Sequence, residues 1–294
     1  LDDTTDFMAI DRDHLVEMEG EIFLITGTER EKRFGLVEEP KPWVKRAISL
    51  TSGRTHVIKL VFDEVFKVQI GAESFRCARS AEKEARVLAL VRADPRFMHG
   101  RGLRDAGGNL VRVLDFIPGQ DLYTHLSTLD LPHQEYLFRD FPTVLAKVTD
   151  NLMGIQRLHD AGLCHGDIRN DHIFVEKESG DFRWIDFDLD QETPAFDVWS
   201  VGNILHFIVG KGVTRLNETL SRRPDLAGHL RHEDAALFFP YRLQNLGKLY
   251  PYLPSCLNQV LVRFAVGTTT RYDRVAQVVE DLRECSHLLG WDGQ

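Results

Sequence analysis

The chain has 294 residues, of which 43% are hydrophobic and 28% are charged. This length and composition suffice for one large domain, or for two lobes with cores of their own. A net charge of -9 argues against non-specific nucleic-acid binding, and the absence of any run of about 18 apolar residues argues against a membrane span.

The cysteines are far apart in the sequence and form no C-x-x-C pair. They are Cys77, Cys164, Cys256 and Cys285. This spacing predicts neither a zinc site nor a disulfide framework. No secretory signal is visible in the sequence. We therefore expect reduced thiols and a cytoplasmic protein.

The N-terminal quarter of the chain predicts a series of β-strands. One strand is expected at residues 21–26, and residues 1–43 are interpreted as an N-terminal β extension. Further strands are expected at residues 44–50, 56–62 and 65–70. Gly53 lies in the turn between the first two of these three strands. Alternation along the third places Val65 and Lys67 on one face, whereas Lys59 belongs to the second.

A helix is predicted to begin at Ser80, whose hydroxyl is a favourable N-cap. Glu82 and Glu84 lie in its first turn, where acidic side chains are stabilising. An apolar stripe at helical spacing continues the pattern through Ala81, Ala85, Leu88 and Val91. The helix is expected to end at Asp94-Pro95, because the residue before a proline disfavours helical geometry.

The middle of the chain predicts a strand followed by a long helix. Residues 109–122 indicate a strand that runs into a Pro-Gly turn, and they include Asp115, Phe116 and Ile117. Apolar residues at helical spacing from Val144 onward indicate a helix that is closed by Gly162.

The C-terminal third predicts helices. Residues 197–210 are apolar nearly all round, which is typical of a buried helix. Its first residue, Asp197, needs hydrogen-bond donors if it is buried, so we expect it to have a structural role. Apolar stripes indicate two further helices, one beginning near Leu257 and the other near Val275.

Acidic and imidazole side chains flank a predicted β-hairpin at residues 163–190. Its strands are residues 173–175 and 182–185, joined by a polar turn. A hairpin brings its two ends together, so we expect Asp167, His172, Asp186 and Asp188 to converge. Such a group of carboxylates needs a cation, and Mg²⁺ held by protein ligands and substrate phosphates is the usual one.

These residues resemble the catalytic motifs of the protein kinase-like superfamily, whose pattern is H-R-D-x-x-x-x-N followed by D-F-G. Here the first motif runs from His165 through Asp167 to His172, and the second is Asp186-Phe187-Asp188. Three positions depart from the pattern, because Gly166, His172 and Asp188 replace Arg, Asn and Gly. A His at the metal position and a D-F-D are also similar to the lipopolysaccharide sugar kinases, and H-G-D resembles the aminoglycoside phosphotransferases.

The resemblance implies an α+β, two-lobed fold, with a β-rich N-lobe at residues 44–117 and a mainly helical C-lobe at residues 118–294. It also implies an ATP- and Mg²⁺-dependent phosphotransferase whose acceptor is a hydroxyl group. Mn²⁺ is an alternative ion, because imidazole suits transition metals better than Mg²⁺.

By the same resemblance, Asp167 positions the acceptor hydroxyl and takes its proton, and Arg169 stabilises the transferred phosphoryl group. The implied metal ligands are Asp186 and His172; the alternative for His172 is a hydrogen bond to the backbone of this loop, without metal binding. Lys67 is chosen over Lys59 to hold the ATP phosphates, because the family's lysine lies on the third strand.

The remaining implied contacts are with the nucleotide. Lys67 would form an ion pair with Glu84, and Val65 would cover the adenine. Gly53 would lie in a glycine-rich loop over the phosphates. The adenine would bind the hinge formed by Asp115, Phe116 and Ile117.

The identity of the acceptor stays open, because only residues 189–196 separate Asp188 from Asp197. Protein kinases have a long activation segment at this point. Protein Ser/Thr kinase-like activity is the first hypothesis. The alternatives are a sugar, lipopolysaccharide or other small-molecule kinase, a RIO-like protein, and a pseudokinase that binds without turnover.

Overall fold

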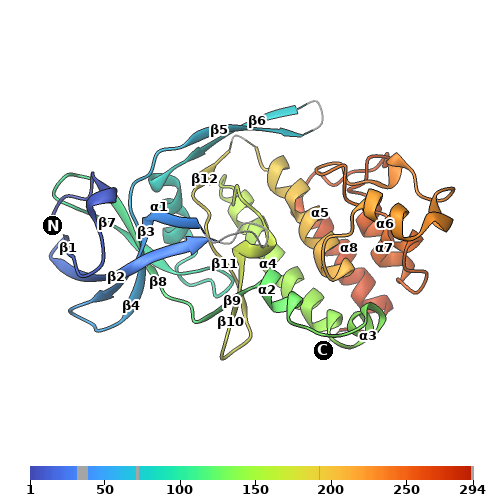
Figure 1. The fold of residues 1–294 in the computed structure, drawn as a ribbon, viewed down its shortest axis with the longest axis horizontal. Helices are drawn as coiled ribbons and strands as arrows, with labels where there is room; N and C mark the ends of the chain where they lie inside the picture. The colour runs from blue at the N-terminus through green and yellow to red at the C-terminus, as the bar shows by residue number, and fades with distance from the viewer. Residues whose placement is uncertain (32–38, 71–72, 192, 293–294) are drawn as a thin grey trace. The chain divides into compact units, whose positions relative to one another are not determined.

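The computed structural model describes residues 1–31, 39–70, 73–191 and 193–292 (Figure 1). The chain divides into two compact units. The β-rich unit comprises Leu1–Val65, Ala78–Pro118 and Asp188–Asp190. The helical unit comprises Phe66–Cys77, Gly119–Phe187 and Gln191–Gln294.

The β-rich unit is built on an antiparallel sheet, six-stranded in the part of the chain described. The strands, in spatial order, are β1 (Leu15–Met18), β2 (Glu21–Glu31), β3 (Glu39–Ser49), β4 (Thr55–Lys59), β8 (Leu110–Asp115) and β7 (Gly100–Arg104). Alternating apolar side chains explain the pairing, since Ile25, Ala47, Ile58 and Val113 are fully buried in one core. A 3-10 helix, η1 (Phe7–Ala9), packs its Phe7 against that core.

The predicted N-terminal extension is part of this sheet. β2 and β3 pair from Phe23↔Ser49 to Glu31↔Glu39, so the boundary expected between residues 43 and 44 lies inside β3. The short predicted strand at 21–26 is in fact an 11-residue strand. Glycine and charged residues in its second half concealed this length, because strand pairing with β3 supplies stability that the local sequence does not.

Helix α1 (Ala81–Leu90) lies against β7 and β8 of the same unit (Figure 1). The predicted N-cap is confirmed, because the Ser80 hydroxyl accepts a hydrogen bond from Lys83 N at 3.1 Å. Val87 and Leu88 are buried on its inner face, as is the carboxylate of Glu84. The cap therefore begins the helix at the position that directs Glu84 inward.

The helical unit consists mainly of helices. The longer ones are α4 (Phe141–Asp160), α5 (Ala195–Gly210) and α8 (Val275–Leu288). The shorter ones are α2 (Leu122–Ser127), α3 (His133–Arg139), α6 (Leu216–Arg222) and α7 (Ser255–Val262), with 3-10 turns η2 (Asn170–His172), η3 (Pro224–Leu226), η4 (His232–Asp234) and η5 (Leu246–Lys248). Helix α4 packs against both α5 and α8. No helix of the described ranges is long and apolar enough to cross a membrane.

The predicted β-hairpin is confirmed. β10 (Ile173–Glu176) and β11 (Phe182–Trp184) pair antiparallel with Ile173 opposite Trp184, and β9 (Gly119–Asp121) adds a third strand. Trp184 is fully buried and donates its indole N–H to Asn151 O at 2.9 Å, which fixes the hairpin on α4. A separate sheet has the order β12 (Leu189–Asp190), β6 (Glu73–Arg79) and β5 (Val65–Ile70).

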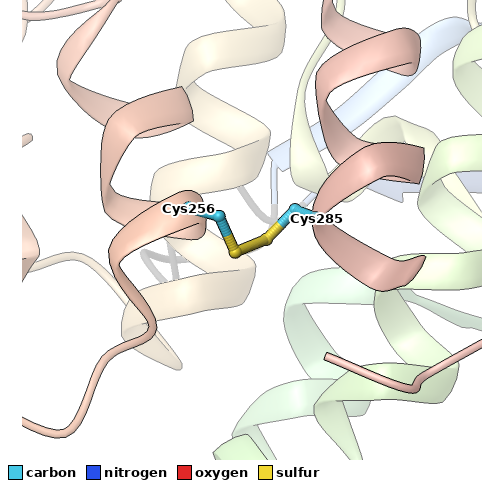
Figure 2. Close-up of a disulfide and its surroundings, with 2 residues drawn as sticks. All are labelled: Cys256 and Cys285. Atoms are coloured by element: carbon cyan, nitrogen blue, oxygen red, sulfur yellow. A yellow bond between two sulfur atoms is a disulfide. The ribbon is translucent and has the colours of Figure 1, made fainter. Parts of the chain in front are cut away.

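The expectation of four reduced thiols is wrong for two of them. Cys256 on α7 and Cys285 on α8 form a disulfide, with 5.5 Å between their Cα atoms (Figure 2). They are 29 residues apart in sequence, and only the packing of α7 against α8 brings them together. Cys77 and Cys164 are buried and are not part of a disulfide.

Candidate active site

In the β-rich unit, Lys59 lies at the end of β4 and is only 4% exposed. Its Nζ is 2.9 Å from Glu84 Oε1 and 3.3 Å from Asp188 Oδ2. Arg112 on β8 is also buried and donates Nε to Glu84 Oε2 at 3.0 Å. A buried lysine is thus held between two carboxylates, one from α1 and one from the segment that follows β11.

The choice of Lys67 as the partner of Glu84 is therefore corrected. Lys67 is exposed on β5, which belongs to a different sheet from β4. The strand at residues 65–70 was counted as the third because β2 is longer than its sequence pattern indicated. Counted from β2, the strand of Lys59 is the third, which is where the resemblance expects the lysine.

The expectation that Val65 covers the adenine is corrected for the same reason. It was placed by sharing a face with Lys67, but its side chain is 61% exposed. On β4, alternation places the half-buried Val57 on the face of Lys59 instead.

Asp188 was expected to converge with the acids of the hairpin. Its carboxylate instead binds Arg79 Nη1, at 2.9 and 3.1 Å, in addition to Lys59. Arg79 also donates Nε to Glu64 Oε2 at 2.9 Å. These contacts all lie within the β-rich unit.

In the helical unit, the imidazole of His172 lies between two carboxylates, with its Nδ1 3.6 Å from Asp167 Oδ2. His172 Nδ1 is 2.8 Å from the backbone oxygen of Asp167, and His172 Nε2 is 3.4 Å from Asp186 Oδ2. Asp186 adopts a left-handed backbone conformation with φ 61°, and Phe187 after it is fully buried. The structure thus brings together Asp167, His172 and Asp186 from the two ends of the hairpin, as the sequence predicted.

Burial raises the pKa of Asp167, and the nearby Asp186 and Asp171 act in the same direction. The charges of His172 and Arg169 oppose this rise in the pKa. Arg169 Nη1 lies 3.8 Å from Asp167 Oδ2, while its Nε and Nη2 bind both oxygens of Asp171 at 2.9 and 2.7 Å. Asp171 therefore holds the guanidinium beside Asp167.

Asp197 anchors the backbone that precedes Asp167. Its fully buried carboxylate accepts hydrogen bonds from His165 N at 2.7 Å, Gly166 N at 2.8 Å and His159 Nε2 at 2.9 Å. Burial raises the pKa of Asp197, but the hydrogen bond and charge of His159, with the Gly166 N–H, bring it below its ordinary value. Gly166 has φ 89°, a backbone conformation that glycine adopts without strain.

The ligand atoms of His159, Cys164 and Asp197 lie within 4.8 Å of one another, as a metal site would require. The carboxylate already accepts three protein hydrogen bonds, so we interpret this group as the anchor of the loop. Gln191 adds a second anchor, because its Nε2 donates to Gly166 O at 2.7 Å.

The other predicted nucleotide contacts, Gly53 and residues 115–117, belong to the β-rich unit. Gly53, with φ 67°, closes the turn between β3 and β4 through a hydrogen bond from its N to Ser49 O, so hairpin geometry accounts for it. Residues 32–38, between β2 and β3, lie outside the described residues. Asp115 lies 3.7 Å from the imidazole of His56. Phe116 lies under the guanidinium of Arg46, and Ile117 is half-buried.

The sequence pattern missed four polar residues of these clusters: Arg79, Arg112, His159 and Gln191. Arg112 had a usable signal, since it is a charged residue inside an apolar strand. His159 had no such signal, because the last turn of its helix, α4, contains other charged residues. Arg79 and Gln191 had none either, because Asp188 lies 109 residues from Arg79 and Gly166 lies 25 residues from Gln191 in the sequence.

Comparison with solved structures matches this chain to the kinase domain of PknI from Mycobacterium tuberculosis. The TM-score is 0.55 at 14% sequence identity, and the match covers 94% of this chain and 99% of that one. Two variants of that domain match with TM-scores of 0.54 and 0.55, at 14% and 15% identity, over 94% of this chain and 98% of theirs. No family model and no curated protein sequence matches.

These matches show the fold. The chain adopts a protein kinase-like fold, with a β-rich N-lobe and a mainly helical C-lobe.

Proposed function

We propose that this protein is an ATP- and Mg²⁺-dependent phosphotransferase that moves the γ-phosphate of ATP to a hydroxyl acceptor. The observation that carries the proposal is the cluster in which His172 connects Asp167 with Asp186. One carboxylate of such a cluster can accept a proton, while the other carboxylate and the imidazole can bind a divalent cation.

Asp167 is assigned to the acceptor hydroxyl. A carboxylate whose pKa is raised is a better proton acceptor than an ordinary one. Arg169 is assigned to the transferred phosphoryl group, because its guanidinium is held close to Asp167 by Asp171.

His172 and Asp186 fit a metal ion by the chemistry of their donor atoms. The Asp167 carbonyl at His172 Nδ1 favours the tautomer with a proton on Nδ1, which leaves Nε2 free to bind a cation beside Asp186. The ion would neutralise phosphate charge when bound. A donor set with imidazole suits Mn²⁺ as well as Mg²⁺.

On the nucleotide side, Lys59 takes the role first given to Lys67, and Glu84 holds it in place. The face shared by Lys59 and Val57 is assigned to the nucleotide, and the backbone of residues 115–117 to the adenine. No phosphate role is assigned to Gly53, since its turn needs glycine for conformational reasons.

Two acceptor classes follow from different observations. The protein kinase-like fold supports a protein Ser/Thr acceptor. The shortness of residues 189–196 supports a sugar or another small molecule, because it leaves little chain for a peptide-binding platform. A scaffold without turnover is disfavoured because Lys59, Asp167 and Asp186 are all present.

The test is nucleotide binding and ATP turnover with a matched pair of lysine variants. Mg-ATP at ten times its Kd should stabilise the protein by about 1.4 kcal/mol, measured by thermal unfolding. Lys59→Met should lose most of this stabilisation, whereas Lys67→Met should keep it. The proposal fails if wild type shows neither stabilisation nor ADP formation with Mg²⁺ or Mn²⁺ across protein and sugar acceptors.

A further inference from the structure

The segment Asp188–Asp190 is attached to the β-rich unit at the start of α1. Ser80 N, at the N-cap of α1, donates to Asp188 O at 2.9 Å, and Lys83 Nζ donates to Leu189 O at 3.0 Å. β12 pairs with β6 through Leu189↔Arg79 and Asp190↔Ala78. The start of α1, whose first turn carries Glu84, is therefore bound to Asp188, the last residue of the second motif, and to Leu189 after it.

The side chains extend this attachment into a buried row of charges. The order is Arg79, Asp188, Lys59, Glu84, Arg112, and each neighbouring pair lies within 3.3 Å. Positive and negative groups alternate, and each of these side chains is at most 8% exposed. Alternation gives every buried charge an opposite neighbour, so removing an interior member leaves its neighbours with fewer partners.

Asp188 is an interior member of this row and takes the place of a glycine in the motif that the sequence resembles. Glycine has no side chain with which to reach Lys59 or Arg79. The two contacts of the Asp188 carboxylate therefore depend on this substitution. They also leave Lys59 fixed from both sides, by Asp188 and by Glu84.

We propose that Asp188 and Arg79 are positioning residues that hold Lys59 against Glu84 in a permanently assembled ion pair, with no phosphorylation needed to form it. This inference rests on the proposed function, because it concerns the lysine assigned to the ATP phosphates. The short chain between Asp188 and Asp197 agrees with it, since a permanently assembled ion pair needs no phosphorylated activation segment to form it.

The decisive experiment is a double-mutant cycle on the Kd of a non-hydrolysable ATP analogue with Mg²⁺, measured by calorimetry on full-length protein. Asp188→Asn should weaken binding about tenfold when Lys59 is present, the effect of losing one charge-assisted contact. In the Lys59→Met background, Asp188→Asn should change the Kd less than about twofold. Glu82→Gln, which alters an exposed acid on α1, is the matched control and should leave the Kd unchanged.

A second measurement tests the absence of a switch. Wild-type protein treated with a phosphatase should keep its full kcat/KM for ATP. If Asp188→Asn does not fold, Arg79→Lys replaces it in the cycle. Lysine keeps the positive charge but has one nitrogen in place of the two with which Arg79 binds Asp188 and Glu64.

Four results would overturn the inference. Equal effects of Asp188→Asn with and without Lys59 would reduce Asp188 to a general structural role. Tighter nucleotide binding in Asp188→Asn would mean that its carboxylate competes with phosphate for Lys59. Loss of activity after phosphatase treatment, in a wild type that binds nucleotide, would refute this inference alone. A wild type that binds no nucleotide would refute the proposed function as well.

Discussion

Replacing Asp197 by alanine should both destabilise the helical unit and stop catalysis. The carboxylate accepts hydrogen bonds from His165 N, Gly166 N and His159 Nε2. All three donors lie just before the loop that carries Asp167. Without the carboxylate, two backbone N–H groups lose their acceptor in the interior.

An unsatisfied buried donor costs about 1–3 kcal/mol, so the two backbone groups together should cost about 2–6 kcal/mol. Asp197 also lies in the first turn of α5, where a negative charge is favourable by about 0.3–1 kcal/mol. Asp197→Asn keeps one acceptor oxygen and should lose less stability than Asp197→Ala. The total is a large part of the 5–15 kcal/mol by which a typical domain is stable.

The assay is urea unfolding followed by circular dichroism, with ADP formation measured on the same preparations. Glu280→Ala, an exposed acid on α8, is the control and should change stability by less than about 0.5 kcal/mol. Because the pKa of Asp197 is lowered in the folded state, its contribution is present above about pH 4 and is lost as the pH falls through the folded pKa. The difference in the free energy of unfolding between wild type and Asp197→Ala should therefore persist at neutral pH and decrease only in strong acid.

If Asp197→Ala lowered the free energy of unfolding by less than about 1 kcal/mol and left turnover unchanged, this reasoning would be refuted. It would mean that water or a neighbouring group replaces the carboxylate as acceptor. Normal stability with lost turnover would instead separate the positioning of Asp167 from the folding of the unit.

Three further predictions concern pH and the disulfide. Burial lowers the pKa of His206 to about 3, so the unfolded state takes up a proton first and the free energy of unfolding falls as the pH drops below about 6.5. His206→Gln should remove about 2 kcal/mol of this loss, measured by urea unfolding at about pH 5. Burial raises the pKa of Asp167, so the folded state binds its proton more tightly and loses stability as the pH rises above the ordinary carboxyl pKa of about 4. Asp167→Asn should therefore raise the Tm at neutral pH while abolishing turnover, and a lower Tm would contradict this. Cys256→Ser opens a link between residues 29 apart and should cost about 3–4 kcal/mol, an effect that a reducing agent reproduces in wild type but not in the variant.

Local pattern alone determined several parts of this protein. The hairpin of β10 and β11, the cap at Ser80 and the buried helix α5 follow from turn residues, capping and periodicity, which act over a few neighbouring positions. The meeting of Asp167, His172 and Asp186 follows too, because a hairpin necessarily joins its own ends.

Only the tertiary structure decided which lysine forms the buried ion pair of the β-rich unit. The choice between Lys59 and Lys67 depended on whether residues 21–31 pair with β3, and strand pairing is decided by the whole sheet. Lys59 meets Glu84 across 25 residues and Asp188 across 129.

The disulfide of Cys256 and Cys285 likewise needed α7 and α8 to pack together. Such contacts leave no periodicity or spacing in the sequence, because folding in three dimensions, and not proximity along the chain, brings the groups within bonding distance.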